Sequence, residues 1–482
     1  MTQTLTNTAT LTAESVVDLD AEKAFGLFGR PESQSWLFAA HCDVVRVGAA
    51  VSLRLPHDDG SSRFGVDLLG HIAEVRPNSS ITIAHTQPWE GRIRLRFDRA
   101  GWQRTRVRVR ADVGADGVAW LIRRTGIVLP TPPVSPGAVR IGMLTSKSGP
   151  GAMYAIATEH MAELAVEEIN NNGGVAGRTL ELVVADDGSD PATAAAETRR
   201  LLHAGCRAIF VVATSSSFAA ARRVVGRNDV LLVHAVMNEG GSFTPQVIRF
   251  GERPARMIEA LAGPLMKTSG ARNWYLVGHE YSWSYGAHFA ARAGLARAGG
   301  RVVGDRYTPL GTNNFGTIIE QINASRADVV MSSLVGADDA MFQRQCYVAG
   351  LRATTKAVSL VLDESTCEHI GAAAAEGIWT AKSYFEGSDE AGNRDLLTAY
   401  RDRHGPFAPP LSSLSETVYE CIVQYARTAA GDIDATAAAH GRALGERSHG
   451  PDSRIGRRDL QSHTLYLAEV RGARLQVFDK TS

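Results

Sequence analysis

Residues 139–191 carry the pattern that most constrains the fold of this chain. A short apolar run, Val139–Leu144, leads into a turn rich in hydroxyl groups and glycine, and a helical stretch follows. A glycine-rich exit at 173–177 precedes a second apolar run, Leu180–Ala185, and an acidic turn ends the segment. Strand, helix and strand in this order predict a βαβ unit with two parallel strands. The segment therefore indicates an α/β domain.

The chain from there to Phe478 continues to alternate short apolar runs with helical stretches. Further candidate strands are Ala208–Ala213, Val230–Val233, Trp274–Gly278, Val329–Ser333 and Ala357–Leu362. We expect parallel sheets that are covered by helices on both faces. Such sheets bind ligands at the carboxyl ends of their strands, and here those ends are rich in Ser, Thr, Gly and aromatic residues.

A proline-rich stretch divides the chain. Four of the seven residues from 130 to 136 are proline, a composition that neither a helix interior nor a central strand accommodates. With 482 residues, the chain is also longer than a single hydrophobic core normally supports. We therefore expect one domain at 13–128, a linker at 129–137 and a second domain at 138–482.

Apolar and polar residues alternate over much of the first domain, which predicts half-buried antiparallel strands. Ile93–Phe97 and Thr105–Arg110 form the clearest pair, with a turn predicted at Asp98–Gly101. A short helix is expected within Asp18–Phe25, with Asp20 as its N-cap. One face of the hairpin is basic, and its arginines are Arg92, Arg94, Arg96, Arg106, Arg108 and Arg110. This face is either a solvated sheet surface or a docking surface for an acidic partner.

The order of a strand, short helices and an antiparallel meander resembles the START-like fold of polyketide cyclases. Gly70–Asn78 resembles a recurrent strand pair of that family. The resemblance implies an α+β domain whose ligand cavity is closed by a long C-terminal helix. Only Gly117–Arg124 is left for that helix, so we expect a shallow or open cavity. Small-molecule binding and a structural or interaction role both remain open for this domain.

Six segments of the second domain, in chain order, resemble type I periplasmic binding proteins. They are Glu163–Gly177, Val211–Ser217, His234–Gly240, Gly278–Trp283, Ser332–Gly336 and Ser359–Glu364. The resemblance is closest to the branch that binds amides and urea. It implies a two-lobed α/β domain that closes on a ligand by a hinge motion.

The resemblance also implies a ligand site in the cleft between the lobes. Its predicted contacts are Ser146, Ser148, Thr214, Ser215, Ser216, His234, Val236, Tyr281, Trp283, Ser333, Val335 and Leu362. Ser216 is the expected centre, because a hydroxyl can both donate and accept; alternatively it caps the following helix. Tyr281 and Trp283 form either flat cleft walls or inter-lobe packing. His234 is a ligand donor, a pH-sensitive group or a core residue.

The apolar residue at position 236 bears on the class of ligand. The amino-acid-binding branch keeps a hydroxyl near this position for the α-carboxylate of its ligand, whereas this chain has Val236 followed by Met237. An ionised carboxylate without a partner is costly to bury. We therefore expect a small neutral or amphipathic ligand rather than a standard amino acid.

Motifs for catalysis and cofactors do not occur in the sequence. It contains no GxSxG, GxxxxGK[ST] or GxGxxG motif, so we expect neither an enzyme nor a bound cofactor. The five cysteines form no CxxC pair, and no metal is predicted. A formal net charge of zero predicts no nucleic-acid partner. The first twenty residues lack an export-signal pattern, and no apolar run is long enough to span a membrane. No membrane insertion and a cytoplasmic location are therefore expected.

These observations favour a cytoplasmic ligand sensor that closes on a small molecule and thereby changes its docking to a regulatory protein partner. The alternative is the substrate-binding component of an ABC-type transporter for amino acids, amides or urea. A third and weaker alternative is a START-like enzyme or carrier with a regulatory binding domain. A homodimer also remains open.

Overall fold

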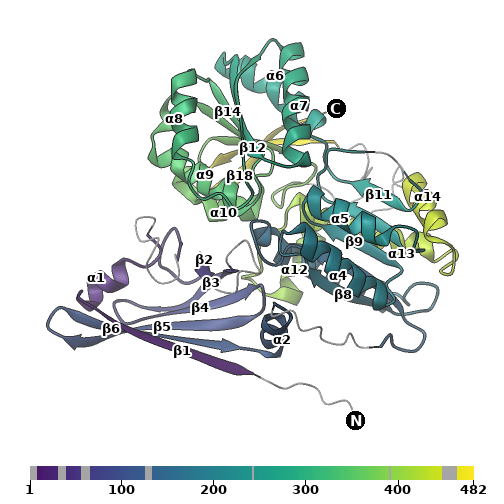
Figure 1. The fold of residues 1–482 in the computed structure, drawn as a ribbon, viewed down its shortest axis with the longest axis horizontal. Helices are drawn as coiled ribbons and strands as arrows, with labels where there is room; N and C mark the ends of the chain where they lie inside the picture. The colour runs from purple at the N-terminus through teal and green to yellow at the C-terminus, as the bar shows by residue number, and fades with distance from the viewer. Residues whose placement is uncertain are drawn as a thin grey trace. The chain divides into compact units, whose positions relative to one another are not determined.

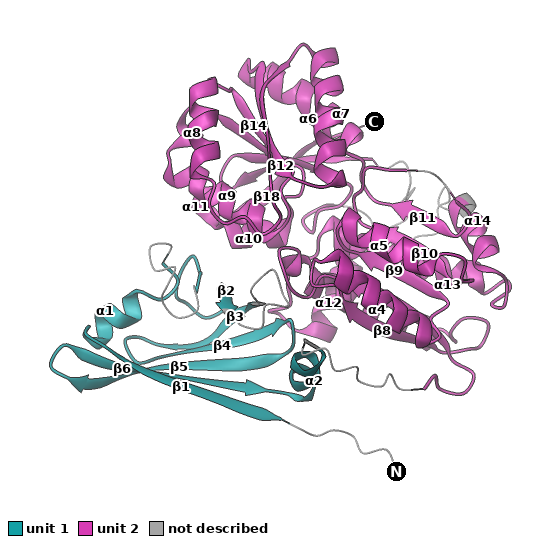
Figure 2. Ribbon diagram, in the orientation of Figure 1, with its two compact units in different colours: residues 1–131 teal, residues 132–482 magenta. Residues whose placement is uncertain are grey.

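The computed structural model describes residues 8–30, 40–55, 66–124, 133–241, 244–389, 392–447 and 464–481. The chain folds into two compact units, residues 1–131 and 132–482 (Figure 2). Of the predicted linker, residues 129–132 lie outside the described ranges, as do residues 125–128 of the predicted first domain. Each unit has its own sheets, and each is described by itself.

In its described residues, unit 1 is an antiparallel sheet with two short α-helices. Its elements are β1 (Ala9–Val17), α1 (Ala21–Gly26), β2 (Ala50–Leu55), β3 (Val66–Arg76), β4 (Ser80–Gln87), β5 (Gly91–Gly101), β6 (Arg104–Val113) and α2 (Ala115–Arg124). Within the described residues the strands form a six-stranded sheet in the order β1-β6-β5-β4-β3-β2 (Figure 1). Asp20 caps α1 as predicted, since its carboxylate accepts a hydrogen bond from the backbone N–H of Lys23 at 2.8 Å.

The β5–β6 hairpin has one buried and one exposed face, as its alternating sequence predicts. Leu95 faces Val109 across the strand pair, and the apolar side chains of β5 are buried while its arginines are exposed. The predicted turn at Asp98–Gly101 is wrong, because β5 continues to Gly101 and the chain reverses at residues 102 and 103. Arg99 pairs with Thr105 and Gly101 with Arg104, so the strand pairing continues through the predicted turn.

The first lobe of unit 2 is a parallel sheet between helices. Its elements are β7 (Val139–Thr145), η2 (Ala152–Tyr154), α3 (Ala155–Asn171), β8 (Leu180–Asp186), α4 (Pro191–His203), β9 (Ala208–Val212), α5 (Ser215–Val225), β10 (Leu231–Ala235), β11 (Val247–Phe250), α13 (Ser413–Ala429) and α14 (Ala437–Arg447). In the described chain the strand order is β11-β10-β9-β7-β8. Helices α3 and α13 cover one face and α4 and α5 the other. Every residue of β7, β9 and β10 is buried, as expected for strands covered on both faces.

The second lobe is a larger mixed sheet. Its elements are α6 (Pro254–Ser269), β12 (Asn273–His279), α7 (Ser282–Ala298), β13 (Arg301–Thr308), α8 (Gly316–Ser325), β14 (Val329–Ser332), α9 (Ala337–Val348), η3 (Leu351–Ala353), β15 (Lys356–Ser359), α10 (Glu364–Ile370), α11 (Ala372–Ala375), β16 (Ile378–Lys382), β17 (Tyr466–Arg471) and β18 (Arg474–Lys480). Over the described ranges the order is β13-β12-β14-β15-β16-β17-β18. The first five strands are parallel, and β17 and β18 add antiparallel at one edge.

The chain crosses between the lobes of unit 2 repeatedly. It leaves the first lobe after β11, returns after β16 through α12 (Asn393–His404), and re-enters the second lobe with β17. Two crossing segments are tied together, because Oε1 of Glu252 accepts hydrogen bonds from the backbone N–H and the hydroxyl of Ser383 at 2.9 and 2.8 Å. The predicted two-lobed α/β architecture is confirmed, and each predicted parallel strand is present within a few residues of its expected limits.

Candidate ligand-binding site

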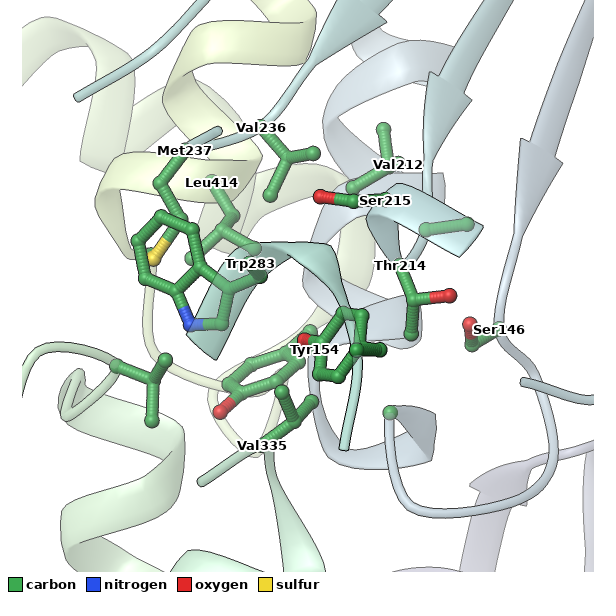
Figure 3. Close-up of a pocket in the computed structure, with 14 residues that line it drawn as sticks. Ser146, Tyr154, Val212, Thr214, Ser215, Val236, Met237, Trp283, Val335 and Leu414 are labelled. Atoms are coloured by element: carbon green, nitrogen blue, oxygen red, sulfur yellow. The ribbon is translucent and has the colours of Figure 1, made fainter. Parts of the chain in front are cut away.

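A pocket lies where loops from both lobes of unit 2 meet (Figure 3). Its lining residues are Ser146, Gly151, Tyr154, Val212, Ala213, Thr214, Ser215, Val236, Met237, Tyr281, Trp283, Val335, Val361 and Leu414. Nearly all of them follow the carboxyl ends of parallel strands, where α/β sheets bind ligands. The space between these side chains measures about 550 Å³ when its part open to solvent is counted.

The pocket has an apolar side and a hydroxyl side. Met237, Leu414 and Trp283 lie together on one side, and the hydroxyl groups of Thr214 and Ser146 lie on the other (Figure 3). All the side chains that line the pocket are uncharged in their usual forms. The site therefore suits an apolar body with a polar head.

Seven of the predicted site residues line this pocket. They are Ser146, Thr214, Ser215, Val236, Tyr281, Trp283 and Val335. The lining does not include Ser148, whose hydroxyl donates to Asp186 at 2.9 Å, or Leu362, which is buried in the second lobe. Ser216, His234 and Ser333 also lie outside the lining.

The structure places Ser215, not Ser216, at the pocket. Helix α5 begins at Ser215, and Thr214 is its N-cap, since the Thr214 hydroxyl accepts a hydrogen bond from the Ser217 N–H at 3.2 Å. The alternative in which Ser216 caps this helix is therefore wrong. Ser216 lies within the first turn and is half-buried.

Ser333 belongs to a buried chain of hydrogen bonds. Nε2 of His288 lies 3.1 Å from its hydroxyl, and Nδ1 of His288 lies 2.7 Å from a carboxylate oxygen of Asp305. Serine, histidine and aspartate in this order are the residue types of a hydrolase triad. Here Ser333 and His288 are fully buried, so the hydroxyl does not face a substrate. These hydrogen bonds join α7 to the middle of β13 and to the residue that follows β14.

His234 is a buried residue of β10 that does not line the pocket. Its ring stacks on Phe218 with 4.0 Å between centroids, and Nε2 lies 3.3 Å from the carbonyl oxygen of Ala213. The pKa of His234 is lowered to about 3, chiefly by burial; the hydrogen bond with Ala213 opposes this, and the charges of Arg249 and Arg253 add smaller decreases. This geometry favours the core alternative for His234.

The pH dependence of stability should reveal this buried imidazole. The ring titrates near 6.5 when exposed and near 3 in the fold, so the unfolded chain binds more protons between these values. Stability is therefore fully present above pH 6.5 and is lost as the pH falls toward 3. Urea denaturation between pH 7 and pH 4 should show a steeper loss for the wild type than for His234→Gln. An equal loss of stability with falling pH in the two proteins would contradict a contribution from His234.

Tyr154 is a lining residue that sequence reasoning missed. Its hydroxyl accepts hydrogen bonds from the Gly336 N–H at 3.0 Å and from the Thr366 hydroxyl at 3.3 Å, so a residue of the first lobe contacts two elements of the second. The Pro150 carbonyl accepts a further bond from the Ala337 N–H at 3.0 Å. An aromatic residue shortly after the Gly-Pro turn was the available signal. The sequence also carried no signal for three apolar lining residues, because nothing distinguishes them from residues of the core. They are Met237, Val361 and Leu414.

Two pocket hydroxyl groups are bound to carboxylates behind them. The Ser146 hydroxyl donates to Oδ1 of Asp187 at 2.7 Å, and the Ser215 hydroxyl donates to Oε2 of Glu239 at 2.6 Å. Burial raises the pKa of Asp187 to about 6, although its hydrogen bonds with serine oppose the rise. Both serine hydroxyl groups therefore direct their protons at carboxylate oxygens and away from the pocket.

The described residues contain neither a cluster of metal ligands nor a disulfide. Within the described residues, no group of three or more His, Cys, Asp or Glu side chains is placed to hold a metal ion. The five cysteines are buried, and none forms a disulfide.

The two lobes, the repeated crossings and the pocket between them define a two-lobed small-molecule-binding domain. The family model described as periplasmic binding protein matches residues 138–473. The chain therefore belongs to the periplasmic binding protein family.

Curated relatives carry names of the branched-chain amino-acid branch. The Leu/Ile/Val-binding protein BraC3 of Rhizobium johnstonii is 26% identical over 229 residues, which are 46% of this chain and 61% of that protein. The Leu/Ile/Val-binding protein of Escherichia coli is 23% identical over 252 residues, 51% of this chain and 67% of that protein. The chain thus spans less than two thirds of the Rhizobium relative. The finer assignment to the amide and urea branch stays a prediction.

Solved structures show the same fold. A periplasmic binding protein from Burkholderia mallei aligns with a TM-score of 0.64 and 17% identity, over 72% of this chain and 95% of that one. A solute-binding protein of an ABC transporter from R. palustris, in complex with benzoate, aligns with a TM-score of 0.63 and 18% identity, over 71% and 96%. A branched-chain amino acid transporter substrate-binding protein from Streptococcus pneumoniae, in complex with isoleucine, aligns with a TM-score of 0.62 and 20% identity. The alignment covers 71% of this chain and 100% of that one.

These comparisons overturn the predicted location. The expectation of a cytoplasmic protein is wrong, because the family model that matches the chain is described as periplasmic binding protein, which points to the periplasm. The relatives are named as binding proteins, which is consistent with a chain that is not an enzyme. In the part of the chain that the structure describes, no helix has both the length and the apolar character needed to span a membrane.

Proposed function

We propose that unit 2 is the solute-binding component of an ABC-type transporter and closes on a small neutral or amphipathic molecule. The observation that carries this proposal is the uncharged pocket built by loops of both lobes. The names of the relatives and of the similar structures support the transporter role over the sensor role.

The lining supports a ligand that is not a zwitterion. An amino acid would bring a carboxylate into a site whose lining side chains carry no positive charge. A buried ion without a counter-charge is costly. The relatives are named for leucine, isoleucine and valine. We therefore propose that this chain differs from them in the head group of its ligand, which is amide- or urea-like.

A thermal-shift screen tests the proposed function. The full chain should show a raised unfolding midpoint with at least one member of a panel of amides, ureas, amino acids and aromatic acids, because ligand binding to the folded state stabilises it. Trp283→Ala should reduce that shift strongly, measured against the variant's own ligand-free midpoint, because Trp283 lines the pocket. Trp102→Ala is the control, since Trp102 lies in unit 1 and is 81% exposed. Equal shifts in both variants would refute this site.

Unit 1 is included in the proposal as a START-like domain at 13–128, joined by a linker at 129–137 to the binding domain at 138–482. Its element order supports this assignment, since α1 follows the first strand, a meander follows, and α2 ends the unit. With ten residues, α2 is short for a helix that closes a cavity. A protein partner and a homodimer stay predictions.

A further inference from the structure

The serine hydroxyl groups on the hydroxyl side of the pocket already donate their protons to other protein groups. A serine hydroxyl has one proton to donate, and Ser146 and Ser215 both donate theirs to carboxylates, Asp187 and Glu239. What remains for a ligand at these two positions is oxygen lone pairs. Both serines therefore act as acceptors toward the pocket.

Thr214 fits the same pattern. Its hydroxyl accepts from the Ser217 N–H and donates to the Ser217 hydroxyl, each at 3.2 Å. Its proton thus points into the protein as well. A ligand head that reaches this side meets oxygen acceptors and must supply the hydrogen-bond donors itself.

The N-terminus of α5 does not reverse this preference. A helix N-terminus carries a partial positive charge that attracts anions, and Ser215 is the first residue of α5. The Glu239 carboxylate lies 2.6 Å from the Ser215 hydroxyl, so the chain supplies an anion at this helix end. Glu239 also packs closely on α7, because a Cβ at Gly286 would lie 2.8 Å from its Cβ.

The opposite side of the pocket offers a donor. Nε1 of Trp283 is buried, and it has no hydrogen-bond partner among the described residues. Trp283 lines the pocket beside Met237 and Leu414. A carbonyl oxygen on the ligand could accept from this indole N–H.

We infer that Glu239 and Asp187 are specificity-determining residues, which orient Ser215 and Ser146 as acceptors and so select a carboxamide head over a carboxylate. A carboxamide supplies N–H donors to the serines and an oxygen acceptor to Trp283. A carboxylate has no donor and would be repelled by Glu239 and Asp187. The inference rests on the proposed function, since it concerns the ligand of the same pocket.

Matched pairs of probes test this inference. The full chain is titrated calorimetrically at pH 7.5 with 4-methylpentanamide and 4-methylpentanoate, and with benzamide and benzoate. Within each pair the apolar body is the same and only the head differs. For at least one pair, the wild type should bind the amide at least about tenfold more tightly, which corresponds to about 1.4 kcal/mol.

Variants separate an effect on the serine hydroxyl groups from a general loss of stability. The quantity compared is the ratio of the carboxylate and carboxamide dissociation constants, which is measured within each protein. Glu239→Ala should narrow the ratio by about tenfold, since it removes the repulsive charge and frees the Ser215 proton. Asp187→Asn keeps an acceptor for Ser146 and should narrow the ratio less. Ser215→Ala should weaken only the amide, whereas Ser216→Ala, the neighbouring control, should leave the ratio unchanged.

Each outcome has a distinct meaning. If the wild type binds a carboxylate as tightly as its amide, or if Glu239→Ala leaves the ratio unchanged, the inference is overturned and the proposed function stands. If neither pair binds while another ligand class does, the carboxamide assignment also fails. If no ligand of the thermal-shift panel binds, the proposed function itself is overturned.

Discussion

Gly336→Ala should weaken ligand binding by about 100-fold, or about 2.7 kcal/mol, while each lobe stays folded. Gly336 lies at the start of α9 with φ of +55° and ψ of −120°, a conformation that residues with a Cβ rarely adopt. A Cβ at this position would overlap the carbonyl oxygen of Pro150 in the other lobe. Because the Gly336 and Ala337 N–H groups bond to Tyr154 and Pro150, the variant should hold the lobes apart.

Calorimetric titration with the strongest hit of the ligand screen measures the effect, and small-angle scattering with saturating ligand reports closure. Gly350→Ala is the matched control, because Gly350 also has a positive φ of +71° but a Cβ there would meet nothing within 4 Å. The control should bind like the wild type. Wild-type affinity in Gly336→Ala would show that the contact between the lobes does not contribute to binding.

Glu252→Ala should lower the free energy of unfolding by about 3–5 kcal/mol, because it removes a buried carboxylate that favours the charged form of Lys382 and accepts two hydrogen bonds from Ser383. Burial lowers the pKa of Lys382, and Glu252 is the carboxylate that opposes this most strongly. The Lys382 ammonium is fully buried and donates to the Leu360 carbonyl at 2.8 Å. Glu252 also ties two crossing segments through Ser383.

Urea denaturation, followed by a signal that reports the unfolding of unit 2, measures this loss of stability. Two further variants are compared with Glu252→Ala. Glu252→Gln keeps a carbonyl oxygen for Ser383 and removes the charge, so it should lose less stability than Glu252→Ala. Glu259→Ala removes an exposed carboxylate from α6 and should change stability by at most about 0.5 kcal/mol. A loss in Glu252→Ala no larger than in Glu259→Ala would contradict the role of Glu252.

Seven parallel strands of unit 2 were predicted because each is a short apolar run, as in Val139–Leu144. Three others in the described chain, β11, β13 and β16, were missed. The β17–β18 hairpin was not predicted, since its place at the edge of a sheet beside β16 depends on pairing between segments far apart in the chain. Local sequence patterns indicate which segments form strands, whereas the order of the strands in a sheet depends on contacts between distant segments.

The candidate site shows the same division. The loop around Thr214 and Ser215 was found because hydroxyl residues follow a buried strand. Which serine lines the pocket depends on where α5 begins, and the Thr214 cap sets that position. Leu414 could not be predicted, because it comes from a helix far along the chain and has no chemical signature of its own.

Contact across the cleft relies partly on main-chain atoms, since the Pro150 carbonyl meets the Ala337 N–H and Tyr154 meets the N–H of Gly336. A peptide group offers the same donor and acceptor whatever side chain it carries. Residues such as Val236 or Val361 can therefore change over evolution without disturbing how the lobes meet. Related proteins can thus bind different ligands through different pocket side chains and still keep the same main-chain contacts between their lobes.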